Sequence, residues 1–211
     1  MTLIAVQPAK SARKAKGDGH LRRAEILRAA EAIFVRDGYQ GATIRKIADE
    51  VGVSSTALYM HFRDKDEILI EIAENAVGVL LASNTEIAGR PLDAVARVRL
   101  MLNAYMRFGL DNPNAYRLVY LSGPDEAPSA KHEQLTEISE RCYECFHNTV
   151  AEIELDGRLP IGKTELAAHL LWSACHGLVA LRICRTQIAW EDNEVLMSSM
   201  LDSVFDGLLI R

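Results

Sequence analysis

Apolar residues recur at helical spacing from about residue 20 to the end of the chain, and no segment shows the alternation typical of a β-strand. The pattern predicts an all-α protein with about nine helices. Three helices make a small N-terminal unit, and six more follow to make a larger body. The expected ranges are about 21–37, 43–51, 54–60, 64–85, 91–110, 112–122, 129–155, 164–185 and 192–209.

Residues at the expected helix boundaries support this division. Gly38 and Gly52 permit the positive backbone φ that ends a helix or makes a tight turn. Pro91 suits the first turn of the fifth helix. Side-chain oxygens that cap helix N-termini precede four of the helices, at Thr43, Ser54, Asp64 and Thr164.

Composition is that of an ordinary soluble protein, with 49% hydrophobic and 25% charged residues in 211. No uninterrupted apolar run approaches the roughly 18 residues of a membrane span, and the N-terminus lacks the pattern of a signal peptide. Four cysteines in a chain of this size are typical of reduced thiols. We therefore expect a cytoplasmic protein, with a flexible basic arm over residues 1–19.

Charge is divided unevenly along the chain. Residues 1–65 carry 12 Lys and Arg against 7 Asp and Glu, a net charge of +5, whereas residues 66–211 carry 12 against 22, a net charge of -10. A basic segment on an acidic body favours one polyanion-binding face, because the body repels the same partner. The overall charge of -5 does not reveal this basic segment, because the acidic body outweighs it.

The basic segment has the layout of a helix-turn-helix. Two short helices meet at a turn that contains Gly52, and the second, Ser54–His61, has the length to enter a major groove. In this second helix the spacing turns Ala57, Leu58 and Phe62 inward. Four residues are left outward, namely Ser55, Thr56, Tyr59 and Met60. We accordingly divide the chain into the arm, a DNA-binding domain over 20–65, and a body over 66–211.

These residues resemble the tetracycline-repressor (TetR) family of bacterial transcription regulators. The resemblance covers residues 22–70 and follows an ordered set of positions: Phe34, Gly38-Tyr39, Thr43-Ile44-Arg45-Lys46-Ile47-Ala48, Gly52-Val53-Ser54, Leu58-Tyr59, His61-Phe62 and Lys65. It implies an N-terminal DNA-binding unit, a helical ligand-binding and dimerisation domain, and double-stranded operator DNA as partner.

The resemblance also implies roles in DNA binding. Thr43, Tyr59, His61 and Lys65 match family positions that contact phosphate, and Arg45 matches one that reaches a base. Two interpretations of Lys46 remain: it contacts phosphate, or it is a solvated surface charge. Many relatives have a basic residue and then Gly at the positions of Ser55 and Thr56, so base preference cannot be borrowed from them. The candidate DNA-binding set is Thr43, Arg45, Lys46, Ser54, Ser55, Thr56, Ala57, Tyr59, His61 and Lys65.

The last two helices, over 164–185 and 192–209, are apolar on several faces. One chain alone would leave that area exposed, whereas pairing with a second copy would bury it. Ala174 and Gly177 would allow close approach of the two copies. In the family these helices form the homodimer, which matches a palindromic operator with half-sites about 34–36 Å apart.

The body also holds candidates for an effector pocket. The segment around Trp172, His176 and Gly177 resembles the Trp/His/Gly signature of one C-terminal subclass, and Trp172 and His176 share a helix face. They either line a pocket, with His176 as its polar anchor, or form a core Trp beside a hydrogen-bonded His. Further aromatic candidates for the pocket wall are Tyr105, Phe108, Tyr116 and Tyr120.

Other chemistry has little support. Cys142-x-x-Cys145 with His147 suggests a metal site, but no second ligand pair lies at a standard spacing, and Phe146 occupies the position that haem attachment needs for His. We expect no metal and no cofactor. The leading hypothesis is a repressor released by a small molecule. The alternatives are an activator or effector-independent regulator, and a helical enzyme, for which the sequence offers no catalytic constellation.

Overall fold

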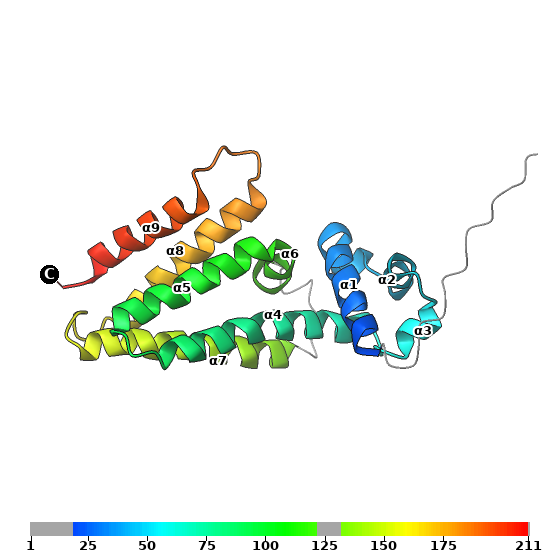
Figure 1. The fold of residues 1–211 in the computed structure, drawn as a ribbon, viewed down its shortest axis with the longest axis horizontal. Coiled ribbons are helices and arrows are strands. Elements are labelled where there is room, and N and C mark those ends of the chain that lie inside the picture. Colours follow the sequence, from blue (N-terminus) through cyan, green and yellow to red (C-terminus); the bar gives the residue numbers. More distant parts are fainter. Residues whose placement is uncertain (1–18, 122–131, 211) are drawn as a thin grey trace, which may run out of the picture.

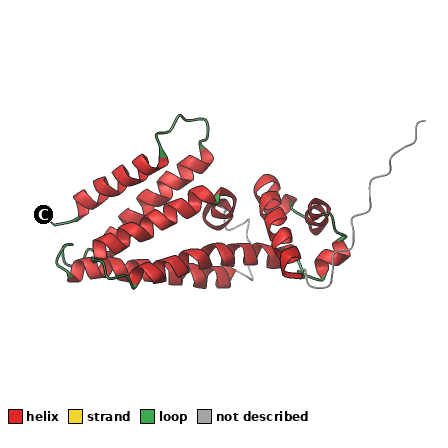
Figure 2. Ribbon diagram, viewed as in Figure 1, coloured by secondary structure: helices red, strands yellow, loops and turns green. Residues whose placement is uncertain are grey.

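The computed structural model describes residues 19–121 and 132–210, and over these residues it is helical with short connecting turns (Figure 2). A unit of three helices lies at one end and a larger helical body at the other, with α4 running from the first into the second (Figure 1). The helices are α1 Gly19–Gly41, α2 Ile44–Val51, α3 Ser55–Tyr59, α4 Lys65–Ala88, α5 Ala94–Asp111, α6 Pro113–Tyr116, the π-helix η1 Arg117–Leu121, α7 His132–Leu155, α8 Thr164–Cys184 and α9 Asn193–Leu208.

The predicted boundaries of the small unit are confirmed. Gly38 has φ 70°, so the regular part of α1 ends before it, and Gly52 closes α2 at φ 74°. The side chains of Thr43, Ser54 and Asp64 each accept a hydrogen bond from the backbone N–H three residues on. Each cap satisfies one of the orphan donors of a helix N-terminus.

Two predicted helix starts in the body are wrong. The fifth helix does not begin at Pro91, because Asp93 caps it by accepting from the Ala96 N–H at 3.0 Å, and the helix starts at Ala94. Thr164 is the first residue of α8 and not its cap. Its hydroxyl instead donates a hydrogen bond of 2.6 Å to a carboxylate oxygen of Glu154.

The segment predicted as one helix over 112–122 divides into the single turn α6 and the π-helix η1. π-helical turns are rare and often occur at functional sites. The arm over residues 1–18, the loop over 123–128 and the expected start of the seventh helix at residue 129 lie outside the described residues.

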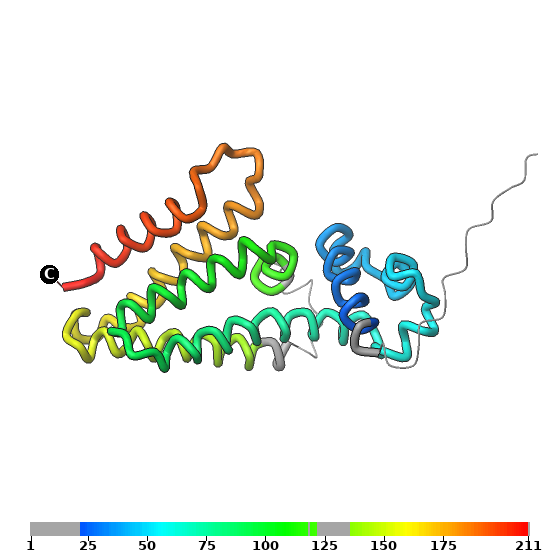
Figure 3. The backbone as a smooth tube through the Cα atoms, in the orientation of Figure 1, coloured from blue at the N-terminus to red at the C-terminus, as the bar shows by residue number. Residues whose placement is uncertain are grey.

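Two buried clusters organise the fold. The small unit buries Ile26, Ile33, Ile47, Leu58 and Phe62, together with side chains from the first two turns of α4. The body has its own core between α5, α7, α8 and α9. Helix α4 therefore belongs to both units, and in the body it lies beside α7 (Figure 3).

Helices α4 and α8 are long and apolar enough to cross a membrane by length and composition, with mean hydropathies of 1.3 and 1.4. Polar residues interrupt both windows, so the expectation that no uninterrupted apolar run reaches this length still holds. Half of the apolar window of α4 is buried between the other helices, as in the core helix of a globular protein. For α8 the buried share is 33%, so this helix keeps a largely uncovered side.

Candidate DNA-binding surface and ligand cavity

Helix α3, the predicted reader, is anchored by two residues and exposes the others. Leu58 and Phe62 are buried in the core of the small unit. Tyr59 is 56% and Met60 83% exposed, so both side chains are open to a partner. The inward placement of Ala57 is wrong: its side chain is exposed, because Leu58 occupies the inward side of this five-residue helix and Phe62 is buried just beyond its end.

Helix α2 places Thr43 and Arg45 in solvent next to the reader. The Arg45 side chain is 87% exposed, and its Nε lies 3.9 Å from the Asp49 carboxylate, so the guanidinium is only loosely held. The Lys46 ammonium is engaged within the unit, where it donates to Asp37 Oδ2 at 2.7 Å and to the Gly41 carbonyl at 2.8 Å. Lys46 and Arg36 together lower the pKa of the Asp37 carboxyl to about 2.

Lys65 joins the start of α4 to the end of α1. Its Nζ donates to the carbonyls of Tyr39 at 2.8 Å and Ala42 at 3.3 Å and lies 4.0 Å from the centroid of the Tyr39 ring. The Tyr39 hydroxyl donates to Asp66, and burial together with this bond raises the pKa of the tyrosine. An ammonium has three donors, and the two carbonyls take up two of them.

Arg23 makes a second joint between the units. Its Nε lies 2.9 Å from Glu71 Oε1 on α4, its Nη1 donates at 2.5 Å to the carbonyl of His61, and the guanidinium stands 4.0 Å from the Phe62 ring centroid. His61, a predicted phosphate contact, is half-buried at this joint. Sequence analysis missed Arg23, since the residues it holds are 38 to 48 positions away.

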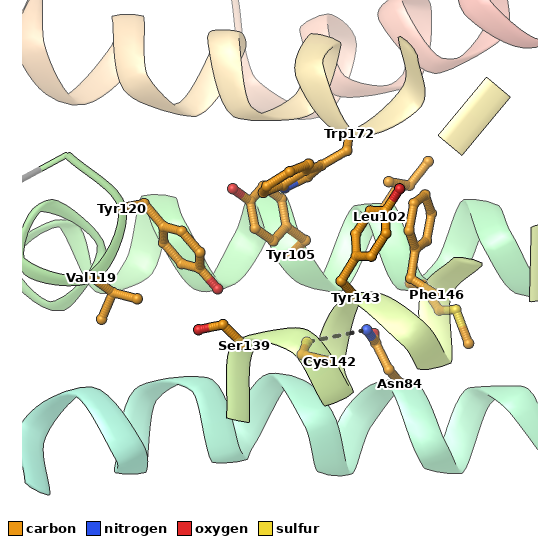
Figure 4. A pocket seen from close by; sticks show the side chains of 11 residues that line it. Asn84, Leu102, Tyr105, Val119, Tyr120, Ser139, Cys142, Tyr143, Phe146 and Trp172 are labelled. Carbon is orange, nitrogen blue, oxygen red and sulfur yellow. Dashed lines mark hydrogen bonds between the residues drawn. The ribbon is translucent and has the colours of Figure 1, made fainter. Parts of the chain in front are cut away.

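Between α4, α5, η1, α7 and α8 the body encloses a cavity of about 240 Å³ (Figure 4). Three predicted pocket residues line it, namely Tyr105, Tyr120 and Trp172. Sequence analysis did not find the other lining residues, because they lie on helix faces with the pattern of an ordinary core. These are Asn84, Met101, Leu102, Val119, Ser139, Cys142, Tyr143 and Phe146.

Two predicted pocket residues stand just behind this lining. Tyr116 is buried, and its hydroxyl lies 2.6 Å from both His176 Nδ1 and the Tyr105 hydroxyl. His176 also lies 3.0 Å from the Tyr105 hydroxyl, and burial lowers its pKa. With Trp172 and Tyr120, His176 borders a second, adjoining hollow. The Tyr105–Tyr116–His176 cluster thus fixes one wall.

Phe108, the remaining candidate, lies apart from the cavity. It borders a cleft between the units, together with Leu27 of α1 and Ile72 of α4. Among residues 19–121 and 132–210, no group of three or more His, Cys, Asp or Glu is placed to hold a metal ion. Of the suspected metal cluster, Cys142 instead lines the cavity, where burial raises the pKa of its thiol to about 11.

Asn84 is a buried polar residue of the cavity whose side-chain oxygen is unsatisfied. It lies on α4 and is 7% exposed, and its Nδ2 donates to Cys142 Sγ at 3.6 Å (Figure 4). Its Oδ1 has no hydrogen-bond partner among the described residues. A buried acceptor without a partner costs about 1–3 kcal/mol, so this atom is a site where a donor would be favourable.

Comparison with known proteins identifies the family to which this arrangement of helices belongs. Residues 26–72 match the family described as bacterial regulatory proteins, tetR family, and residues 98–204 match a tetracyclin repressor-like C-terminal domain. The chain is 31% identical over 157 residues to the nucleoid occlusion factor SlmA of Vibrio cholerae, covering 71% of this chain and 78% of that protein. It is 32% identical over 114 residues to the transcriptional activator FasR of Mycolicibacterium smegmatis, covering 52% of each.

A solved structure agrees in fold. The ketosteroid transcriptional regulator KstR2 of Mycobacterium tuberculosis superposes with a TM-score of 0.76 at 19% identity, over 90% of this chain and 96% of that one. The Trp/His/Gly subclass stays a prediction. Since the family matches take in both the helix-turn-helix and most of the body, the chain belongs to the TetR family of DNA-binding transcriptional regulators.

Proposed function

We propose that this protein is a cytoplasmic homodimeric repressor that leaves a palindromic operator when a small molecule fills the cavity in its body. The observation that carries the proposal is the position of α4. One end of this helix forms part of the cavity wall through Asn84, and the other is fastened to the DNA-reading unit through Lys65 and Glu71.

The exposed residues of α2 and α3 would form the DNA contact. Arg45, Ser55, Thr56 and Ala57 would face base edges, and an Arg is suited to bidentate binding of guanine. The phosphate contacts would be Thr43, Tyr59, His61 and Lys65, while Lys46 is paired with Asp37 within the unit. Ser54 caps α3 with its Oγ 3.1 Å from the Ala57 N–H, so its main contribution is to hold the reader helix in place. Met60 and Arg63, both exposed beside the reader, extend this surface.

The uncovered side of α8 supports the predicted dimer. Leu166, Leu170 and Leu181 are each about half exposed and lie on one stripe of the helix. Gly177 lies on the same stripe, and a Cβ placed there would meet no atom within 4 Å. The outward side of α9 carries small and acidic residues, so α8 would supply the apolar centre of the interface and α9 its rim.

A ligand would act on DNA binding through two contacts between the units. Because α4 is bonded to the reading unit at its first turns, any shift of α4 must move that unit. The π-helix η1 also lines the cavity, through Val119 and Tyr120, and packs against α1. Release requires the ligand to favour a form in which the two readers no longer match successive groove turns. Such coupling is typically worth about 1–3 kcal/mol.

The first test is DNA binding. Operator sequences are selected from a random pool, and the affinity of variants is measured by fluorescence anisotropy. Tyr59→Ala should weaken binding to all sequences alike, while Arg45→Ala should also relax base preference. Arg90→Ala, which alters an exposed arginine paired with Glu86 far from the reader, is the control. Unchanged binding for both Tyr59→Ala and Arg45→Ala would disprove this placement of the reader.

Activation is the second candidate, favoured by the similarity to FasR, whose name records an activator. A reporter gene behind the selected operator distinguishes the two, because a repressor lowers expression and an activator raises it. Regulation without an effector has less support, since the cavity and its unpaired Asn84 oxygen would then have no use. An effector that saturates the cavity and leaves operator affinity unchanged would contradict the release mechanism.

A further inference from the structure

The lining of the cavity carries no charged side chain among the described residues. Burial raises the pKa values of Tyr105 and Tyr120, so both phenols are neutral near pH 7. The carboxylate that reaches the lining is that of Glu165, which accepts from the Tyr143 hydroxyl at 3.4 Å and is itself largely exposed to water. A charged ligand group would therefore lose its hydration without gaining a partner of opposite charge.

Apart from Asn84, Ser139, the Cys142 thiol and the tyrosine hydroxyls, the lining is apolar and aromatic. Tyr143 and Trp172 stand with ring centroids 5.7 Å apart on one side, and Phe146 lies next to Tyr143 at 6.3 Å. Figure 4 shows these rings above the cavity and Asn84 below it, on the α4 side. A cavity of about 240 Å³ has room for a ligand of two fused rings with one polar substituent.

From this lining we infer that the effector is an uncharged, mainly apolar molecule that donates one hydrogen bond to Asn84 Oδ1. The inference rests on the proposed function, which assigns the effector to this cavity. Asn84 is more than nine-tenths buried and lines the cavity, and its Nδ2 is already engaged with Cys142. The free lone pairs of Oδ1 thus define the chemistry of the missing partner as an O–H or N–H donor.

The experiment compares three probes that share one ring system and differ at one position. 2-Naphthol is neutral and donates a hydrogen bond, 2-methoxynaphthalene is neutral without a donor, and 2-naphthoate is charged. Binding to the full-length protein is measured by isothermal titration calorimetry. We expect 2-naphthol to bind about tenfold more tightly than the ether, which is the usual effect of one buried hydrogen bond. 2-Naphthoate should bind at least about a hundredfold more weakly than 2-naphthol.

Two variants test the role of the amide. Asn84→Leu keeps the size of the side chain and removes the acceptor, so 2-naphthol should fall to the affinity of the ether, while the ether is unaffected. Asn103→Leu is the matched control, because Asn103 donates to the Arg99 carbonyl on α5 and does not line the cavity. It should leave all three affinities unchanged. If Asn84→Leu does not fold, the comparison of the alcohol with the ether on the natural protein still decides the question.

Several results would overturn the inference. These are equal affinities for 2-naphthol and the ether, tighter binding of 2-naphthoate, an unchanged 2-naphthol affinity in Asn84→Leu, and no binding of any probe. Operator affinity, measured in the same samples, separates this inference from the proposed function. If 2-naphthol binds through Asn84 but leaves operator affinity unchanged, ligand-driven release fails and the ligand class stands. If another molecule releases the protein from DNA while 2-naphthol does not bind, ligand-driven release stands and the inferred ligand class fails.

Discussion

Arg23 offers a sharp test of how the reading unit is fastened to α4. Arg23→Met keeps the aliphatic stem and removes the bonds to Glu71 and to the His61 carbonyl, as well as the contact with the Phe62 ring. The Glu71 carboxylate, 25% exposed, is then left without its partner. The DNA-reading unit should lose both stability and operator affinity.

The magnitude follows from the three contacts. Hydrogen bonds to a charged group contribute about 1.5–3 kcal/mol, and we take the lower part of this range because the two side chains are 34% and 25% exposed. The cation–π contact adds about 0.5–1 kcal/mol. Arg23→Met should therefore lower the free energy of unfolding by about 2–3 kcal/mol. Arg90→Met, which removes an exposed pair with Glu86, should cost less than about 0.5 kcal/mol.

The assay is urea denaturation at one fixed protein concentration. Urea does not screen charges as guanidinium does, and a fixed concentration is required because a dimer is stabilised by mass action. The double variant Arg23→Met/Glu71→Leu completes a thermodynamic cycle. It should recover part of the loss, since replacing both partners by apolar groups leaves no unpaired carboxylate. A loss below about 0.5 kcal/mol in Arg23→Met, or a double variant as unstable as the sum of the single changes, would refute this reasoning.

Three further predictions concern the body. Gly109→Ala would place a Cβ 2.5 Å from Val179 Cγ1 and 2.7 Å from Tyr116 Cδ2, so it should destabilise the protein by about 1–3 kcal/mol, and an unchanged melting temperature would contradict this. Gly177→Leu meets open space and should fold, yet prevent close approach of two α8 helices; light scattering should show a monomer, and a dimer of undiminished strength would speak against the interface. Burial lowers the pKa of His176 below its ordinary 6.5, so the unfolded chain binds that proton at higher pH and stability falls as the pH drops. Between about pH 7.5 and about pH 5.5, His176→Gln should therefore lose less stability than the natural protein, and equal losses would exclude this role.

The helices were predictable because their signals are local. Caps such as Ser54 and Asp64 act on N–H groups three residues away, and Gly38 and Gly52 act on their own backbone. The errors at Pro91 and Thr164 arose where a neighbour competed, since Asp93 is a better cap and Glu154 captures the Thr164 hydroxyl. Periodicity also failed for Ala57, because a helix of five residues is too short to define its inward face by spacing alone.

Local sequence patterns were enough to predict the all-α class and the helix-turn-helix, because these depend on residues a few positions apart. The chemistry that the body can bind follows from its tertiary packing. Asn84 meets Cys142 from 58 positions away, and Arg23 meets Glu71 from 48. On its own helix, Asn84 is one polar residue on an otherwise buried face, with no local sign of the cavity. Its unpaired oxygen has meaning only once α4, α5, η1, α7 and α8 exclude water around it, which is a property of their packing and not of any one of them.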